Sequence, residues 1–222
     1  MIMSFDAKGP DTGDAPGREE IALFAASLPR LHDAALHLIQ GRKTSPVGVC
    51  VALARSVGAV DLTAEAGQDF RRRFNGFYGV RRNGAWREAF YSAFEAMKAE
   101  TGSADIFFDG MLAAVFDRTG RTEASFVSKA VAVLRPESPI IDSVVRARLA
   151  KRISAPPFGG GLENASAYYR WLSDVFESLG RTEEAGAWSV VFDEAFADVP
   201  GAASLHIHRK LDFLIWGGTS VD

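Results

Sequence analysis

Two ionisable residues in the segment 117–152, Lys129 and Asp142, have positions from which they could act chemically. Lys129 lies at the edge of the apolar face that Phe126 and Ala130 would form on a helix. An amine in such a place becomes a nucleophile when burial lowers its pKa. Asp142 follows a Pro-Ile-Ile tripeptide and precedes a helical pattern. Its carboxylate could therefore activate a water molecule or stabilise positive charge on a substrate.

Both residues also have an ordinary structural interpretation. A lysine at the edge of an apolar face covers the core with its methylene groups and extends its amine to solvent, which is one role for Lys129. An aspartate before a helix caps its first turn, a contribution of about 1 kcal/mol. A capping carboxylate stays ionised, so capping and catalysis are compatible for Asp142.

The segment 71–87 is rich in arginine, contains no acidic residue and carries interleaved aromatic side chains. Arginine binds phosphates and aromatic rings stack on unpaired bases, so this pattern predicts a nucleic-acid surface with Phe77 and Tyr78 as stacking candidates. A solvated helix end with aromatic core residues is the alternative. The arginines predicted to contact DNA are Arg71, Arg72, Arg73, Arg81 and Arg82, with Arg146 and Arg148 in a second basic group after Asp142.

Other catalytic arrangements are absent from the sequence. The four histidines, His32, His37, His206 and His208, form no pair with the i, i+4 spacing of helical metal ligands. There is no Gly-x-Ser-x-Gly elbow, phosphate-binding P-loop or dinucleotide fingerprint. We therefore expect neither a metal nor a cofactor.

Composition places the chain among globular proteins of a reducing compartment. Of its 222 residues, 47% are hydrophobic and 24% charged, and only Cys50 is a cysteine. No apolar run is long enough to span a bilayer, and the acidic, glycine-rich N-terminus is unlike a signal peptide. We expect a cytoplasmic protein without membrane contact. Because the net charge is −3, DNA binding would depend on a local basic face.

The hydrophobic pattern predicts an all-α protein, a compact bundle of about nine or ten helices. No segment of more than a few residues alternates with period two, and the ambiguous apolar segment 47–60 is assigned to a helix because its neighbours are helical. Residues 1–17 are expected to form a flexible leader, and residues 18–222 one helical domain or two lobes that meet near 155–161. Arg209 and Lys210, in the final helix, are expected at the surface.

The Thr119-Gly120-Arg121-Thr122 turn between two predicted helices, followed by Pro139-Ile140-Ile141-Asp142 before a third, resembles the helix-hairpin-helix DNA glycosylase superfamily. The likeness is to a divergent, oxoguanine-glycosylase-like bacterial member. It implies a central helix-hairpin-helix element. It also implies that Gly120 and the amides of Arg121 and Thr122 contact a DNA phosphate, while a loop delivers Asp142 as the catalytic acid.

The resemblance further implies hydrolysis of the N-glycosidic bond of a damaged or modified base that is flipped out of DNA. The nucleophilic lysine of bifunctional members would fall near Thr122 or Glu123 in this chain, and neither is lysine. A hydrolytic glycosylase is therefore expected rather than a lyase, with Lys129 in a supporting role. The alternative is a non-catalytic helical module that binds nucleic acid or a protein partner through the same basic residues.

Overall fold

The computed structural model describes residues 16–218, and all the regular structure in this range is helical. It contains 11 α-helices and three short 3-10 helices, which confirms the all-α prediction and exceeds the expected nine or ten. A 3-10 turn at Leu28–Leu31, which contains Pro29, separates the first two α-helices. The predicted leader lies outside the described residues, except for Pro16 and Gly17.

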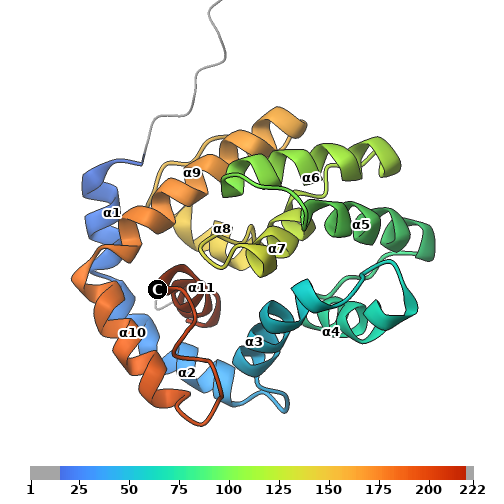
Figure 1. The fold of residues 1–222 in the computed structure, drawn as a ribbon. Coiled ribbons are helices and arrows are strands. Elements are labelled where there is room, and N and C mark those ends of the chain that lie inside the picture. The colour runs from blue at the N-terminus through green and yellow to red at the C-terminus, as the bar shows by residue number, and fades with distance from the viewer. Residues whose placement is uncertain (1–15, 219–222) are drawn as a thin grey trace, which may run out of the picture.

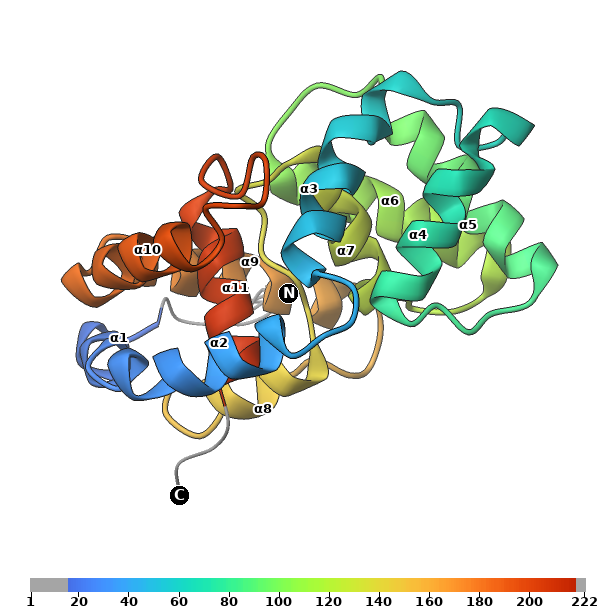
Figure 2. The ribbon, with the colours of Figure 1, turned by 90° about the horizontal axis from the view of Figure 1, so that it is seen from below.

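The helices form two groups, which Figure 2 shows side by side. One group, the α11 group, surrounds the last helix, as seen in Figure 1. The other, the α3–α7 group, comes from the middle of the chain. The α11 group consists of α1 (Arg18–Ala25), α2 (His32–Gln40), α8 (Ser143–Leu149), α9 (Leu162–Gly180), α10 (Glu183–Ala195) and α11 (Ile207–Gly217), and the α3–α7 group of α3 (Pro46–Ser56), α4 (Gln68–Tyr78), α5 (Gly84–Met97), α6 (Ala104–Thr119) and α7 (Ala124–Leu134).

The chain enters the α3–α7 group through residues 41–45 and leaves it through residues 135–142. Segment 155–161, where the sequence suggested that two lobes could meet, connects α8 and α9, which both pack on α11. The two groups join where α6 packs on α9. There the buried rings of Phe108 and Tyr169 stack with centroids 3.9 Å apart.

The positions at which several helices begin or end are determined by residues close to them in the sequence. Asn83 caps α5 by accepting a hydrogen bond from the Trp86 amide, and Thr182 caps α10 in the same way through the Ala185 amide. Gly120 ends α6 in the left-handed conformation, with φ of +65°. These ends are where the sequence pattern predicts them, because each depends on residues within one turn of the helix.

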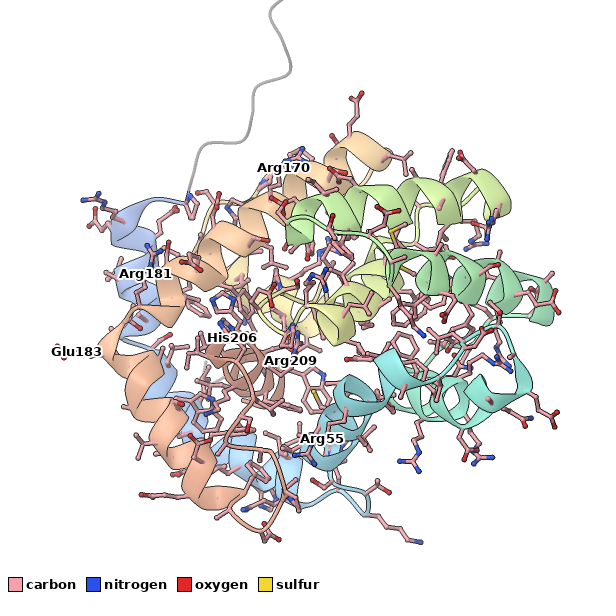
Figure 3. The ribbon with its side chains drawn as sticks, viewed as in Figure 1. Arg55, Arg170, Arg181, Glu183, His206 and Arg209 are labelled. Carbon is pink, nitrogen blue, oxygen red and sulfur yellow. The ribbon has the colours of Figure 1, made fainter. Side chains whose placement is uncertain are left out.

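The surface positions expected for Arg209 and Lys210 are wrong, because each residue is only 3% exposed. Figure 3 shows Arg209 near the middle of the molecule. The physical reason is that α11 packs against α2, α8, α9 and α10, so little of its circumference faces solvent. Both charges are paired, with Arg209 3.1 Å from Asp212 and Lys210 2.7 Å from Asp193.

None of the helices within residues 16–218 combines the length and the apolar sequence needed to cross a membrane. The longest, α9, has 19 residues and carries Glu163, Arg170, Asp174 and Glu177, all exposed, at spacings that place them on one face. Its other face is buried. It is an amphipathic helix with one face in the core.

Candidate functional site

Lys129 and Asp142 line the same cavity, which has a volume of about 550 Å³ and lies where the two helix groups meet. This volume is in the range of sites that hold small organic groups. We call it the Lys129 pocket. Its lining also includes Arg42 and Lys43 from the loop before α3, Cys50 from α3, Arg72, Arg73, Phe77 and Tyr78 from α4, and Arg209, Asp212 and Trp216 from α11.

Lys129 is 8% exposed, so its amine does not extend freely to solvent. Its Nζ donates a hydrogen bond to Ser125 Oγ at 3.1 Å and lies 5.3 Å from the ring centroid of Phe126 and 5.7 Å from that of Tyr78. Among residues 16–218, no carboxylate lies within ion-pair distance of it. Burial lowers the pKa of Lys129, against the weaker opposing effect of nearby carboxylates. The lowered pKa increases the fraction of uncharged, nucleophilic amine.

Asp142 caps α8, as the sequence predicts, with Oδ1 accepting a hydrogen bond from the Val144 amide at 2.8 Å. The cap uses one carboxylate oxygen and leaves the other for a ligand. The loop before the cap is fixed by the buried Ser128, whose Oγ accepts a hydrogen bond from the Ile141 amide at 2.9 Å. Since Ser128 precedes Lys129, this bond links the placement of the lysine to that of the aspartate.

The side of the pocket formed by α11 carries a buried ion pair that sequence reasoning missed. Arg209 donates to Asp212 Oδ2 at 3.1 Å and to the Ser138 carbonyl at 2.8 Å. Burial raises the pKa of Asp212 to about 6, although Arg209 acts in the opposite direction. Asp212 Oδ1 is buried with no hydrogen-bond partner among the described residues. The available signal was an Arg and an Asp three residues apart in a helix that also carries Leu211, Phe213 and Leu214.

The lining is strongly basic. Six lysine and arginine side chains and two aspartates face this one cavity, whereas the whole chain has a net charge of −3. Arg42 and Lys43 were not predicted as site residues. A concentration of positive charge in a cleft attracts anionic ligands.

Aromatic side chains provide the apolar part of the lining. Phe77 and Tyr78, the predicted stacking residues, both line the pocket, with ring centroids 4.6 Å apart. Trp216, which was not predicted, faces it from α11, and the Arg42 guanidinium lies 5.3 Å from the centroid of that ring. The cavity therefore combines flat apolar surfaces with cations at its edge, as binding of a base attached to a phosphate would require.

The predicted DNA-binding arginines of segment 71–87 separate into different roles. Arg72 and Arg73 are exposed and line the pocket, while Arg81 is exposed outside it. Arg71 donates to the carbonyls of Leu62 and Ala64, which fixes the loop before α4. Arg82 pairs with the buried carboxylate of Glu123 at 3.0 Å.

The second predicted group of arginines also has structural partners. The Arg146 guanidinium lies 3.7 Å from the ring centroid of Phe158, and Arg148 donates to the Ile215 carbonyl at the end of α11. Neither residue lines the Lys129 pocket. Contacts between these residues and DNA stay predictions.

The turn at residues 120–123 joins α6 and α7, and α7 begins at Ala124 rather than near Thr122. Gly120, Arg121 and Thr122 are exposed and do not line the pocket. Arg121 Nε donates to the buried Glu123 carboxylate at 3.1 Å. That this turn is a helix-hairpin-helix element of the glycosylase type stays a prediction.

Within residues 16–218, no group of three or more His, Cys, Asp or Glu side chains is arranged to hold a metal ion. Burial raises the pKa of the Cys50 thiol to about 11, so this lining residue is a neutral thiol at physiological pH. The ionisable groups of the lining that can take part in acid–base or nucleophilic chemistry near neutral pH are Lys129, Asp142 and Asp212.

Comparisons of the chain with protein-family models, curated proteins and solved structures find no match. Its function therefore has to be inferred from the chemistry of the pocket.

Proposed function

We propose that the protein is a DNA glycosylase, which receives a damaged or modified base in the Lys129 pocket and cleaves its N-glycosidic bond. The observation that carries this proposal is that Lys129 and Asp142 line one cavity with aromatic walls and basic edges. A base within a duplex is inaccessible to such a cavity, so it has to be flipped out of the stack. Aromatic walls favour the flipped base, and Arg72 and Arg73 favour its phosphates.

Asp142 supplies the first part of the chemistry. Its carboxylate stabilises the positive charge that develops on the sugar as the bond between C1′ and the base nitrogen breaks. It also accepts a proton from the water molecule that attacks C1′, and the base leaves with the electron pair of the broken bond and is protonated. Both roles require an ionised carboxylate.

Lys129 supports a second route to the same bond cleavage. In its uncharged form, the amine attacks C1′ and displaces the base, and opening of the sugar ring then gives an imine between Nζ and C1′. The observation that favours this route is the burial of Nζ without a carboxylate partner among the described residues. Borohydride reduces an imine, so trapping of a covalent protein–DNA adduct separates this route from direct hydrolysis.

The test is base release from oligonucleotides that each carry one modified base. In the Asp142→Asn variant, base release is expected to fall by at least about 100-fold, the scale of lost general-base catalysis, while DNA affinity is retained. Asparagine also caps helices, so the variant keeps the fold. The control is Asp198→Asn, at an exposed residue outside the pocket. Base release at the wild-type rate in Asp142→Asn would refute the catalytic assignment.

A non-catalytic module that binds nucleic acid through the same residues is the alternative function. It predicts salt-dependent DNA binding that weakens in Arg73→Gln, with no release of any base tested. If the wild-type protein shows no salt-dependent DNA binding, both functions are rejected.

A further inference from the structure

A second cavity, of about 590 Å³, lies between α4 and α5 and is assigned no role above. We call it the α4–α5 cavity. It shares Arg72 with the Lys129 pocket. Its other polar lining residues include Arg71, Asn75, Arg87, Glu88 and Tyr91.

The two cavities flank one helix. On α4, residues 72, 73, 76 and 77 line the Lys129 pocket, whereas residues 68, 71, 72 and 75 line the α4–α5 cavity. At 100° per residue these sets occupy neighbouring faces that meet at Arg72. An α-helix with its side chains is about 10 Å wide, and each strand of a duplex advances about 3.4 Å along the duplex axis per nucleotide. The cavities are therefore separated by roughly two or three nucleotides of a strand.

The lining of the α4–α5 cavity is suited to anions, since it contains three arginines and Glu88 as its one acid. Arg87 is exposed, and its side chain has no hydrogen bond or ion pair with any residue in the range 16–218. Arg72 pairs with Asp69 at 2.6 Å, but their side chains are 72% and 70% exposed, so this pair is weak enough for a phosphate to replace.

The back of the cavity is held in place by hydrogen bonds. The hydroxyl of Tyr91, which is 2% exposed, donates to Asn75 Oδ1 at 2.8 Å. This bond occupies the oxygen of Asn75 and leaves its amide N–H groups as donors. Arg71 is fixed by the carbonyls of Leu62 and Ala64, which bind one of its nitrogens. A rigid set of donors without an exposed aromatic ring fits a phosphate better than a base.

We propose that the α4–α5 cavity binds the sugar–phosphate backbone of the strand whose base enters the Lys129 pocket. Arg72 contacts the strand between the two cavities, and Arg87 binds a phosphate two or three nucleotides from the base. This inference rests on the proposed function, but it concerns DNA binding and not bond cleavage.

The test compares Arg87→Gln with Arg30→Gln, an exposed arginine outside the predicted DNA-binding segment that lines neither cavity. The measurement is the affinity for labelled oligonucleotides without a modified base, by fluorescence anisotropy, between 50 and 200 mM salt. We expect Arg87→Gln to weaken binding to all sequences and to reduce the slope of log K against log salt by about 0.7 for single strands. Arg30→Gln is expected to leave the slope unchanged.

A second experiment measures the same affinities with oligonucleotides of different lengths. The effect of Arg87→Gln should disappear for single strands of about two nucleotides, which are too short to reach both cavities. Equal slopes for the two variants, or an effect that persists in the short strands, would overturn the inference while leaving the glycosylase proposal intact. If base release is never found but the slope still changes only in Arg87→Gln, the cavity assignment stands and the glycosylase proposal fails.

Discussion

Two buried lysines, Lys129 and Lys210, differ in how their charge is compensated. Lys210 Nζ lies 2.7 Å from Asp193 and 2.9 Å from Ser189 Oγ. Lys129 Nζ has one hydroxyl partner, Ser125, and the faces of two aromatic rings. Burying an ammonium group without a carboxylate costs free energy, and such costs are typical of residues kept for function. Lys129 is therefore expected to lower the stability of the fold that holds it.

Lys129→Met is predicted to raise the free energy of unfolding at pH 7 by about 1 kcal/mol and to reduce base release. The reason is that methionine fills a similar volume without a charge to desolvate. Lys210→Met is the matched control and is predicted to lower the free energy of unfolding by about 2 kcal/mol, because it leaves Asp193 without its partner. Urea denaturation followed by circular dichroism measures both.

The same prediction has a pH dependence with a defined sign. Folding lowers the pKa of Lys129 from its ordinary value of 10.5. At pH values between the lowered pKa and 10.5, the native state therefore binds fewer protons than the unfolded chain. The contribution of Lys129 to stability therefore rises with pH in this window. The advantage of Lys129→Met should shrink between pH 7 and pH 10, and a constant or growing advantage would contradict the assignment of Lys129 as a buried, unpaired amine.

At the scale of helices, glycine has opposite effects at two positions. Gly120 adopts a φ of +65° at the end of α6, where an added Cβ would meet no atom within 4 Å. Gly186 lies inside α10, also with no atom within 4 Å of such a Cβ. Steric contacts are thus absent at both sites, and only backbone conformation distinguishes them.

Gly120→Ala is predicted to lower the free energy of unfolding by about 1 kcal/mol, since L-residues disfavour the left-handed conformation. Gly186→Ala is predicted to raise it by about 0.5–1 kcal/mol, because alanine loses less backbone entropy in a helix. Thermal and urea denaturation of the two variants test the pair. Shifts of the same sign would contradict the helix-end geometry at Gly120.

The elements predicted from sequence are those that neighbouring residues determine. The cap at Asn83 and the end at Gly120 need only bonds within one turn, so periodicity and capping residues place them. Asp142 was placed for the same reason. Interactions between distant segments were not predictable, such as the pairing of Arg82 with Glu123, 41 residues away. No local pattern indicates that this arginine, expected to bind DNA, has a structural partner.

The missed part of the candidate site has the same explanation. Arg209, Asp212 and Trp216 line the pocket because α11 lies among four other helices. Sequence reasoning treated its charges as exposed, since burial depends on which helices pack around it and not on the helix itself. That Lys129 and Asp142 line one cavity depends on the same packing between distant segments.

At the scale of the whole molecule, the contact between α6 and α9 joins the two helix groups whose meeting creates the Lys129 pocket. It contains the stack of Phe108 on Tyr169, which is fully buried, and the exposed ion pair of Asp109 and Arg170 at 3.1 Å. Apolar burial outweighs an exposed ion pair, so the stack is expected to provide most of the stabilisation.

Phe108→Ala is predicted to lower the free energy of unfolding by about 3–5 kcal/mol, through lost burial and the cavity left between the groups. Arg170→Ala, at the same contact, is predicted to lower it by less than about 1 kcal/mol. Urea denaturation gives both values. Similar costs for the two variants would mean that the helix groups are held together elsewhere.

The position of α11 among the helices has a consequence for synthesis. The chain leaves the ribosome from its N-terminal end, so α2, α8, α9 and α10 are made before the helix on which they pack. Until residues 207–217 emerge, the apolar faces that pack on α11 lack that partner. The nascent chain then carries Lys129 and Asp142 but lacks the side of the pocket that α11 supplies. Ligand-binding ability is therefore acquired in the same late step that completes the core.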